Sequence, residues 1–254
     1  MRTPLLLLGL LSALLPAAAI IAQPAPPPPR TVTFLYWSQA NPPSGLSVLP
    51  AGARAASSLD LYPFTRSAPV VLGATATSVE LRVRPPAQPP GAPARPDVTL
   101  LKTALPADVT SATIVVFPGE NASAPWQSIV LRDDLERFPA ASARVINLTP
   151  YALAARLGGR IVQLDPGMAE AVILTPADML RVKLVAALRV QDQWLPPAAT
   201  NANSPTTGRV LFLVGSSNQS TMIDPQSPPV PGARVEPRIV ALVDIPPKPA
   251  SSGS

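Results

Sequence analysis

Alternation of apolar and polar residues runs through the middle of this chain and predicts β-strands. In Ser78–Arg84 every second residue is apolar, so one face of a strand would be apolar and the other charged. The longest alternation, Leu180–Val190, places Arg181, Lys183 and Arg189 opposite an apolar set that begins with Leu180. A helix would scatter these cations around its circumference. We therefore expect a strand with one face in water.

Other strand candidates are continuous apolar runs, at residues 112–117 and 209–214, which suit strands covered on both faces. The remaining candidates are residues 31–37, 127–132, 144–148 and 238–245. Proline, glycine or asparagine follows almost every one, as expected where a strand ends. This punctuation, at intervals of about ten residues, predicts an all-β fold: an antiparallel β-sandwich, Ig-like or related, with about a dozen short strands and little helix.

Turn-forming residues divide the segment 143–173. Two short apolar runs flank Gly158–Gly159, and glycine supplies the positive φ angles that a two-residue hairpin turn needs. The alternative is a two-turn helix from Pro150 to Gly158, but so short a helix is marginal on its own, and we favour a hairpin over residues 151–164. Asp165-Pro166-Gly167 predicts a tight turn. The expected structural turn positions are Asn147, Pro150, Gly158, Gly159, Pro166 and Gly167.

The two ends of the chain differ in composition from its middle. Residues 1–22 have a basic start, an apolar run and small residues, the order of a secretory signal peptide, with an uncleaved anchor as the alternative. Residues 23–30 are proline-rich and predict an extended spacer, and residues 246–254 predict a disordered tail. The sandwich is expected at 31–245, as one large domain or as two coupled halves that divide near 106–126.

Composition narrows the chemistry. The chain has no cysteine and no histidine, which excludes disulfides, common zinc and haem sites, and any nucleophile that needs an imidazole base. No Ser-x-x-Lys motif offers a lysine base instead. The net charge of +5 comes from scattered residues, not from a basic cluster, so we expect no nucleic-acid partner. We also expect no cofactor, no metal, no catalytic residue and no membrane span after signal cleavage.

The densest acidic group is Asp133-Asp134-Leu135-Glu136. Paired carboxylates can bind calcium or hydrolyse glycosides, but the alternating ligands and glycine of a calcium loop are missing. Arg132 and Arg137 flank the group and would neutralise it. We therefore expect a solvated loop or a single helical turn.

Three further features have structural explanations. Trp37, Trp126 and Trp194 all lie at ends of predicted strands, where rings pack on a core more often than they form a sugar platform. Three Asn-x-Ser/Thr triplets are treated as chance. The runs at 114–117 and 211–214 each lead into a polar loop, which suggests two related halves. Because only these ends match, we interpret the similarity as coincidence.

A longer motif combines Arg144-Val145-Ile146-Asn147-Leu148-Thr149-Pro150, then Leu157-Gly158-Gly159, then Leu164-Asp165-Pro166-Gly167. The stretch of about residues 143–173 resembles small exported bacterial β-sandwich modules of unknown function, and is similar to periplasmic accessory proteins of alginate acetylation. The resemblance implies a sandwich that acts outside the cytoplasm, and it transfers no catalytic residue.

Together these observations predict an exported, periplasmic or extracellular, non-enzymatic structural or interaction protein of the bacterial cell envelope. Its partner would be an envelope protein or a polysaccharide, contacted through exposed strand edges. The first alternative is an accessory factor in exopolysaccharide modification or assembly. The second is a hydrolase that uses carboxylates.

Overall fold

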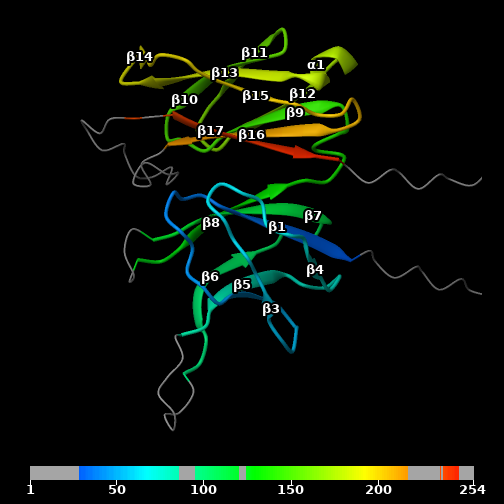
Figure 1. Ribbon diagram of the computed structural model, residues 1–254, viewed down its shortest axis with the longest axis vertical. Coiled ribbons are helices and arrows are strands. Elements are labelled where there is room, and N and C mark those ends of the chain that lie inside the picture. The colour runs from blue at the N-terminus through cyan, green and yellow to red at the C-terminus, as the bar shows by residue number, and fades with distance from the viewer. Residues whose placement is uncertain (1–28, 86–94, 120–123, 217–234, 236, 246–254) are drawn as a thin grey trace, which may run out of the picture.

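The computed structural model describes residues 29–85, 95–119, 124–216, 235 and 237–245. The described chain is almost entirely β-structure, in four sheets stacked as layers, which confirms the all-β sandwich prediction (Figure 1). The signal peptide, most of the spacer and the tail predicted for residues 1–22, 23–30 and 246–254 lie outside the described residues. Arg30, which we assigned to the spacer, instead begins the first strand and is buried.

Strands β1 to β8 form the first sandwich. Layer 1 has the order β3-β2-β5-β6 and layer 2 the order β4-β1-β7-β8. Their bounds are β1 Arg30–Tyr36, β2 Leu46–Pro50, β3 Ser57–Ser58, β4 Val70–Leu72, β5 Ser78–Val83, β6 Val98–Ala104, β7 Ser111–Phe117 and β8 Gln127–Arg132.

Strands β9 to β17 form the second sandwich. Layer 3 has the order β12-β9-β16-β17, and layer 4 the order β11-β10-β13-β14, with β15 also paired to β13. The bounds are β9 Ser142–Asn147, β10 Ala152–Leu157, β11 Arg160–Leu164, β12 Ala169–Ile173, α1 Pro176–Leu180, β13 Val182–Val190, β14 Gln193–Trp194, β15 Ala198–Ala202, β16 Arg209–Ser216 and β17 Pro237–Asp244.

The second sandwich repeats the topology of the first. β9, β10, β11 and β12 occupy the places of β1 to β4, and β13, β15, β16 and β17 those of β5 to β8. The runs at 114–117 and 211–214 lie in β7 and β16, which are equivalent strands. Our interpretation of their similarity as coincidence is therefore wrong. The chain passes from the first sandwich to the second between Arg132 and Ser142, and β7, which lies in the region 106–126 where we expected a division, pairs with β1 and β8 of the first sandwich.

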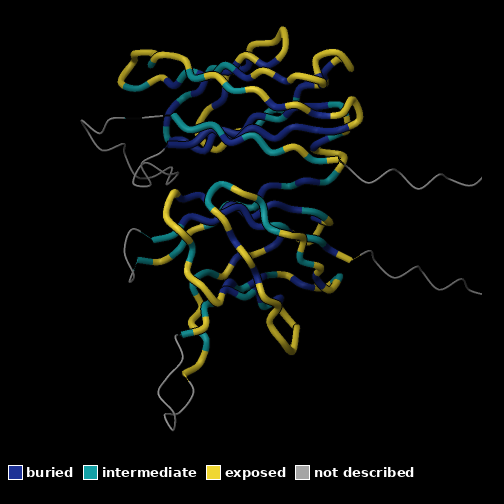
Figure 2. The backbone as a smooth tube through the Cα atoms, in the orientation of Figure 1, coloured by how far each residue is buried: buried dark blue, intermediate teal, exposed yellow. Residues whose placement is uncertain are grey.

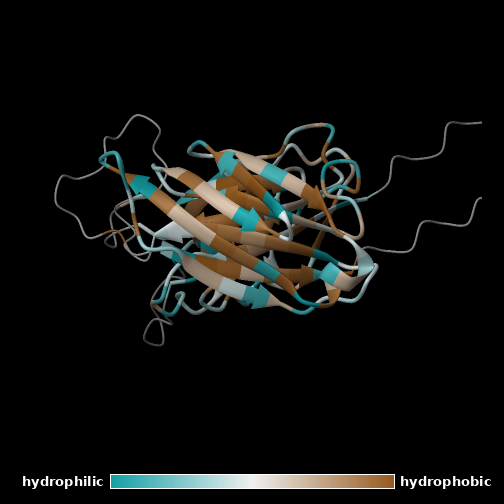
Figure 3. Ribbon diagram, turned by 90° about the horizontal axis from the view of Figure 1, so that it is seen from above, coloured by the Kyte–Doolittle hydropathy of each residue, from teal (hydrophilic) through white to brown (hydrophobic). Residues whose placement is uncertain are grey.

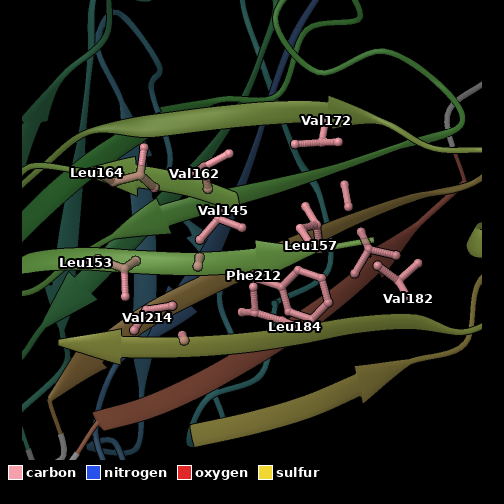
Figure 4. Close-up of a cluster of buried hydrophobic side chains, with 14 of the residues drawn as sticks. Val145, Leu153, Leu157, Val162, Leu164, Val172, Val182, Leu184, Phe212 and Val214 are labelled. Atoms are coloured by element: carbon pink, nitrogen blue, oxygen red, sulfur yellow. The ribbon is translucent and has the colours of Figure 1, made fainter. Parts of the chain in front are cut away.

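Continuous apolar strands occupy the two middle layers because both of their faces are covered. In β16, Val210, Phe212 and Val214 face layer 4, whereas Leu211 and Leu213 face the first sandwich. β1, β7 and β9 divide their side chains between two cores in the same way. Figure 2 shows these middle strands as buried, and Figure 4 shows the core between layers 3 and 4 around Phe212.

Two strand pairs depart from the antiparallel pattern. β1 lies parallel to β7, with Thr31 opposite Ser111, and β9 lies parallel to β16, with Ser142 opposite Arg209. In each sandwich the first strand thus pairs with a strand near the end of the same half. A hairpin turn could not join these strands, because two parallel strands need a long connection between them.

The predicted hairpin is confirmed, because β10 and β11 pair in antiparallel fashion. Leu157 lies opposite Arg160 next to the turn, and Leu153 lies opposite Leu164 at the other end. Gly158 has the positive φ angle expected of the turn, +58°, but Gly159 does not. In the Asp165-Pro166-Gly167 turn, Gly167 has φ +76° and Met168 N donates to Asp165 O at 3.0 Å. Leu180 was expected to begin the long strand's apolar face, but it ends α1 and is exposed.

Candidate functional site

The two sandwiches meet through a continuous apolar interface. Leu35, Trp37 and Val115 of the first sandwich pack with Ile146 and Leu213 of the second, in one buried cluster. At Gly215 the contact is so close that a Cβ would lie 2.2 Å from the Trp37 ring. Glycine at this position lets β16 lie directly against the indole.

A turn from the first sandwich reaches over the same interface. Phe64 has a left-handed φ of +54° and meets Trp37 edge to face, with ring centroids 5.4 Å apart. The Arg238 guanidinium, on β17, lies 3.7 Å from the centre of the Phe64 ring. The contacts of the Phe64 ring with Trp37 and Arg238, one on each sandwich, offset the cost of this left-handed backbone conformation.

Beside this apolar interface lies a charged group that we call the junction cluster: Arg66, Asp133, Arg209 and Asp244. Asp133 follows β8 directly, where the chain passes to the second sandwich. Arg209 begins β16 and Asp244 ends β17, opposite each other in register. Arg66 comes from the connection between β3 and β4.

Arg209 is buried, and all three nitrogens of its guanidinium donate hydrogen bonds. Nε and Nη2 donate to Asp244 Oδ2 at 2.8 and 2.5 Å, and Nη1 donates to the carbonyl oxygens of Asp133 and Phe138 at 2.7 and 2.8 Å. The guanidinium also lies 4.7 Å from the centre of the Phe138 ring. Arg209 thereby ties the connection between the sandwiches to layer 3.

Arg66 and Asp133 are less completely satisfied. Arg66 Nη2 lies 3.7 Å from Asp133 Oδ2, and Nη1 lies 4.0 Å from Asp244 Oδ2. Asp133 is 6% exposed and accepts a hydrogen bond from Thr113 Oγ1. However, Asp133 Oδ1 and the Nε and Nη2 atoms of Arg66 are buried without a hydrogen-bond partner. Burial raises the pKa of the Asp133 carboxyl, against the opposing effects of Arg66, Thr113 and Arg209.

The acidic residues of the segment 133–136, which we expected to be solvated, differ in their exposure. Glu136 is exposed, as expected, and Asp134 is neutralised by Arg132, whose Nε donates at 3.0 Å. Asp133 is buried, which corrects the prediction. Sequence reasoning also missed Arg209 and Asp244. Their signal was an arginine immediately before one apolar run and an aspartate at the end of another, which become neighbours once those runs pair.

A cavity of about 390 Å³ opens beside the cluster and is lined by Asp133, Asp134 and Asp244 together with hydroxyl side chains such as Thr33 and Ser111. A pocket that joins Asp133 to other acids is what a hydrolase that uses carboxylates would need. Within the described residues, no group of three or more carboxylates could hold a metal ion. Asp134 and Asp244 each form an ion pair with an arginine, and Asp133 lies 3.7 Å from Arg66 Nη2, so each of the three acids in this cavity has an arginine beside it.

Asn147, one of the predicted turn positions, ends β9. Asn147 is fully buried: Nδ2 donates to Tyr151 O at 2.7 Å and to Leu164 O at 3.1 Å. Asn147 Oδ1 accepts from both the N and the Oγ1 of Thr149. A glycan could not be attached to so enclosed an amide in the folded protein, and the triplets at Asn121 and Asn218 lie outside the described residues.

The three tryptophans do not form a shared platform. Trp37 is buried between the sandwiches and Trp126 is half-buried against Tyr36, with ring centroids 5.7 Å apart. Core packing is thus confirmed for these two. Trp194 is 49% exposed, contrary to the prediction.

The fold and this junction define a two-sandwich, all-β protein whose halves share one interface. No protein-family model and no curated protein matches the chain. Among the residues that the structure describes, no helix has the length and apolar character needed to cross a membrane.

Proposed function

We propose that the chain is an exported, non-enzymatic interaction protein of the bacterial cell envelope. The observation that supports it most is a feature repeated in both sandwiches. β4 and β12 are topologically equivalent edge strands, and each exposes a large apolar side chain, Val71 at 68% and Ile173 at 63%. An edge strand has free backbone donors and acceptors, so a partner strand can pair with it.

Export is supported by the composition of residues 1–22, which have the basic start, apolar run and small residues of a secretory signal peptide. Export is tested by fractionating bacteria that express the full chain and by sequencing the amino terminus of the product. A periplasmic product that begins at Gln23 supports the proposal, and a cytoplasmic product with Met1 contradicts it.

The interaction is tested by capture from envelope fractions with the purified protein. We expect a specific protein partner that a Val71→Asp/Ile173→Asp variant no longer retains. Leu180→Asp is the control, because Leu180 is similarly exposed but belongs to α1 and not to an edge strand. Equal retention by all three proteins would contradict the edge-strand interaction, whereas retention of polysaccharide machinery would favour the accessory role in exopolysaccharide assembly.

A carboxylate hydrolase is the second candidate, and the cavity beside Asp133 favours it. In this mechanism Asp133, when protonated, would donate a proton to the leaving oxygen while a second carboxylate of the cavity activates the water that attacks the sugar. Hydrolysis of envelope glycans that Asp133→Asn abolishes, with folding intact, would support this candidate. Glycans left unchanged by the unmodified protein would contradict it.

A further inference from the structure

The outer face of layer 4 lies at one end of the stack, and no other layer covers it (Figure 1). In β13 the even-numbered residues enter the core, so Lys183, Val185, Ala187 and Arg189 point outward. The register with β10 places Arg156 opposite Val185. Figure 3 looks down on this layer, in which hydrophilic and hydrophobic positions alternate along the strands.

The side chains of three cations, Arg156, Arg181 and Lys183, form no ion pair or hydrogen bond with another described residue. All three line a cavity of about 400 Å³ beside the turn at Gly158–Gly159. Asp178 lines the same cavity, and its carboxylate accepts from Thr175 Oγ1 at 2.7 Å. The lining therefore holds three positive groups and one negative group, an excess of positive charge that favours an anion.

The rest of this face has small side chains at its centre and an aromatic ring at its far end. Ala154 and Ala187 lie opposite each other in the register, so small side chains cover the centre of the sheet. At the far end Trp194 lies opposite Arg189, and Trp194 is half-exposed. At ~3.3 Å per residue, Lys183 and Arg189 are about 20 Å apart along β13.

We propose that the outer face of layer 4 binds an anionic polysaccharide, a chain of sugar rings that carry carboxylates. Guanidinium and ammonium groups at the cavity bind carboxylates, and an exposed indole stacks on the apolar face of a sugar ring. The alanine floor leaves room for flat rings between the two. A membrane fits this face less well, since its exposed apolar residues, Ile161 and Trp194, lie on different strands with cations between them.

This inference goes beyond the proposed function. It concerns a face of the second sandwich, whereas the proposed protein partner would bind the strand edges at Val71 and Ile173. A purified protein suffices to test it, so the result does not depend on export or on the identity of a protein partner.

The test measures binding of a galacturonate oligomer to the purified chain at low ionic strength. We expect saturable binding that weakens as salt is added, because the contacts are charged and exposed. The Arg156→Glu/Lys183→Glu variant should bind about tenfold more weakly, since it loses two surface contacts and gains repulsion. Arg54→Glu is the matched control, because Arg54 is exposed and without an ion pair but lies in the first sandwich.

Trp194→Ala distinguishes a saccharide from other polyanions. It should weaken binding of the galacturonate oligomer several-fold and leave binding of inorganic polyphosphate unchanged. Thermal unfolding midpoints equal to that of the unmodified protein show that the exposed substitutions leave the fold intact. The proposal is overturned if the oligomer does not bind, if a neutral glucan binds equally well, if Arg54→Glu weakens binding as much as the double variant, or if Trp194→Ala has no effect on the oligomer.

Discussion

The side-chain amide of Asn147 forms hydrogen bonds with Tyr151, just before β10, and with Leu164, at the end of β11. The amide group bonds two backbone carbonyl oxygens and receives two hydrogen bonds from Thr149, all within the buried end of β9. These bonds hold the start of β10 against the end of β11. The bond from Thr149 N is the local contact that asparagine commonly makes at a turn, whereas the contact with Leu164 O, seventeen residues away, has no signal in the sequence.

Replacing Asn147 with Ala should therefore destabilise the protein substantially. The change leaves buried carbonyl and hydroxyl groups without partners, which costs about 2–3 kcal/mol in the free energy of unfolding. Urea unfolding followed by circular dichroism measures it. Asn201→Ala is the control, because Asn201 is exposed on layer 4 and its loss should change stability little. Equal effects of the two substitutions would show that the buried amide is not needed.

Asp133 makes stability depend on pH. Because burial raises its pKa in the folded protein, the folded state holds the proton over a pH range in which the unfolded chain, with a carboxyl pKa near 3.8, has released it. The contribution of Asp133 is fully present below 3.8 and is lost as the pH rises through the folded value.

Asp133→Asn removes this titration. The free energy of unfolding of the unmodified protein should fall, relative to that of the variant, as the pH rises from acidic toward neutral values. Chemical unfolding of both proteins across that range measures the difference. A constant difference would mean that Asp133 titrates normally and is not buried as described.

At the scale of elements, Gly215 fixes how closely β16 approaches the first sandwich. Gly215→Ala should force the added Cβ against the Trp37 ring and destabilise the protein by about 1–3 kcal/mol. Gly73→Ala is the matched control, because a Cβ at Gly73 meets no atom within 4 Å. Combining Gly215→Ala with Trp37→Leu should recover part of the loss. Full additivity of the two changes would contradict the contact.

The elements that the sequence predicted best were those with a clear pattern. Strict alternation identified β5 and β13, continuous apolar runs identified β7 and β16, and a Gly-Gly pair between two apolar runs identified the β10–β11 hairpin. Shorter strands such as β3 and β4 have too few residues to show a period. The alternation in the sequence begins at Leu180, but the strand begins only at Val182. Leu180 instead ends a short helix that Thr175 caps and Pro176 begins.

The junction cluster could not be predicted, because its members come from four separate segments. Only the pairing of β16 with β17 brings Arg209 to Asp244, and only the stacking of layers 2 and 3 brings Arg66 and Asp133 to them. A sequence pattern reports neighbours along one strand. It contains no information on which layers will stack.

At the scale of the whole molecule, the shared interface makes the two sandwiches one body. Leu213 is fully buried there, so Leu213→Ala should cost about 2–5 kcal/mol. Because the interface belongs to both halves, we expect one cooperative unfolding transition before and after the change. Hydrogen exchange should accelerate in β1 and β7 as well as in β9 and β16. Acceleration confined to the second sandwich, or two separate transitions, would show that the halves unfold independently.

The parallel pairs also set the order in which the chain can fold. Thr31 finds Ser111, and Ser142 finds Arg209, only after nearly a whole sandwich has been synthesised. Such distant pairings raise the contact order and slow folding, because a long loop must close before the contacts form. During synthesis the first sandwich can close once β7 and β8 have emerged, and it then presents a finished layer 2 on which layer 3 assembles. The repeated topology therefore gives the protein two successive slow steps, with the first half serving as the template for the second.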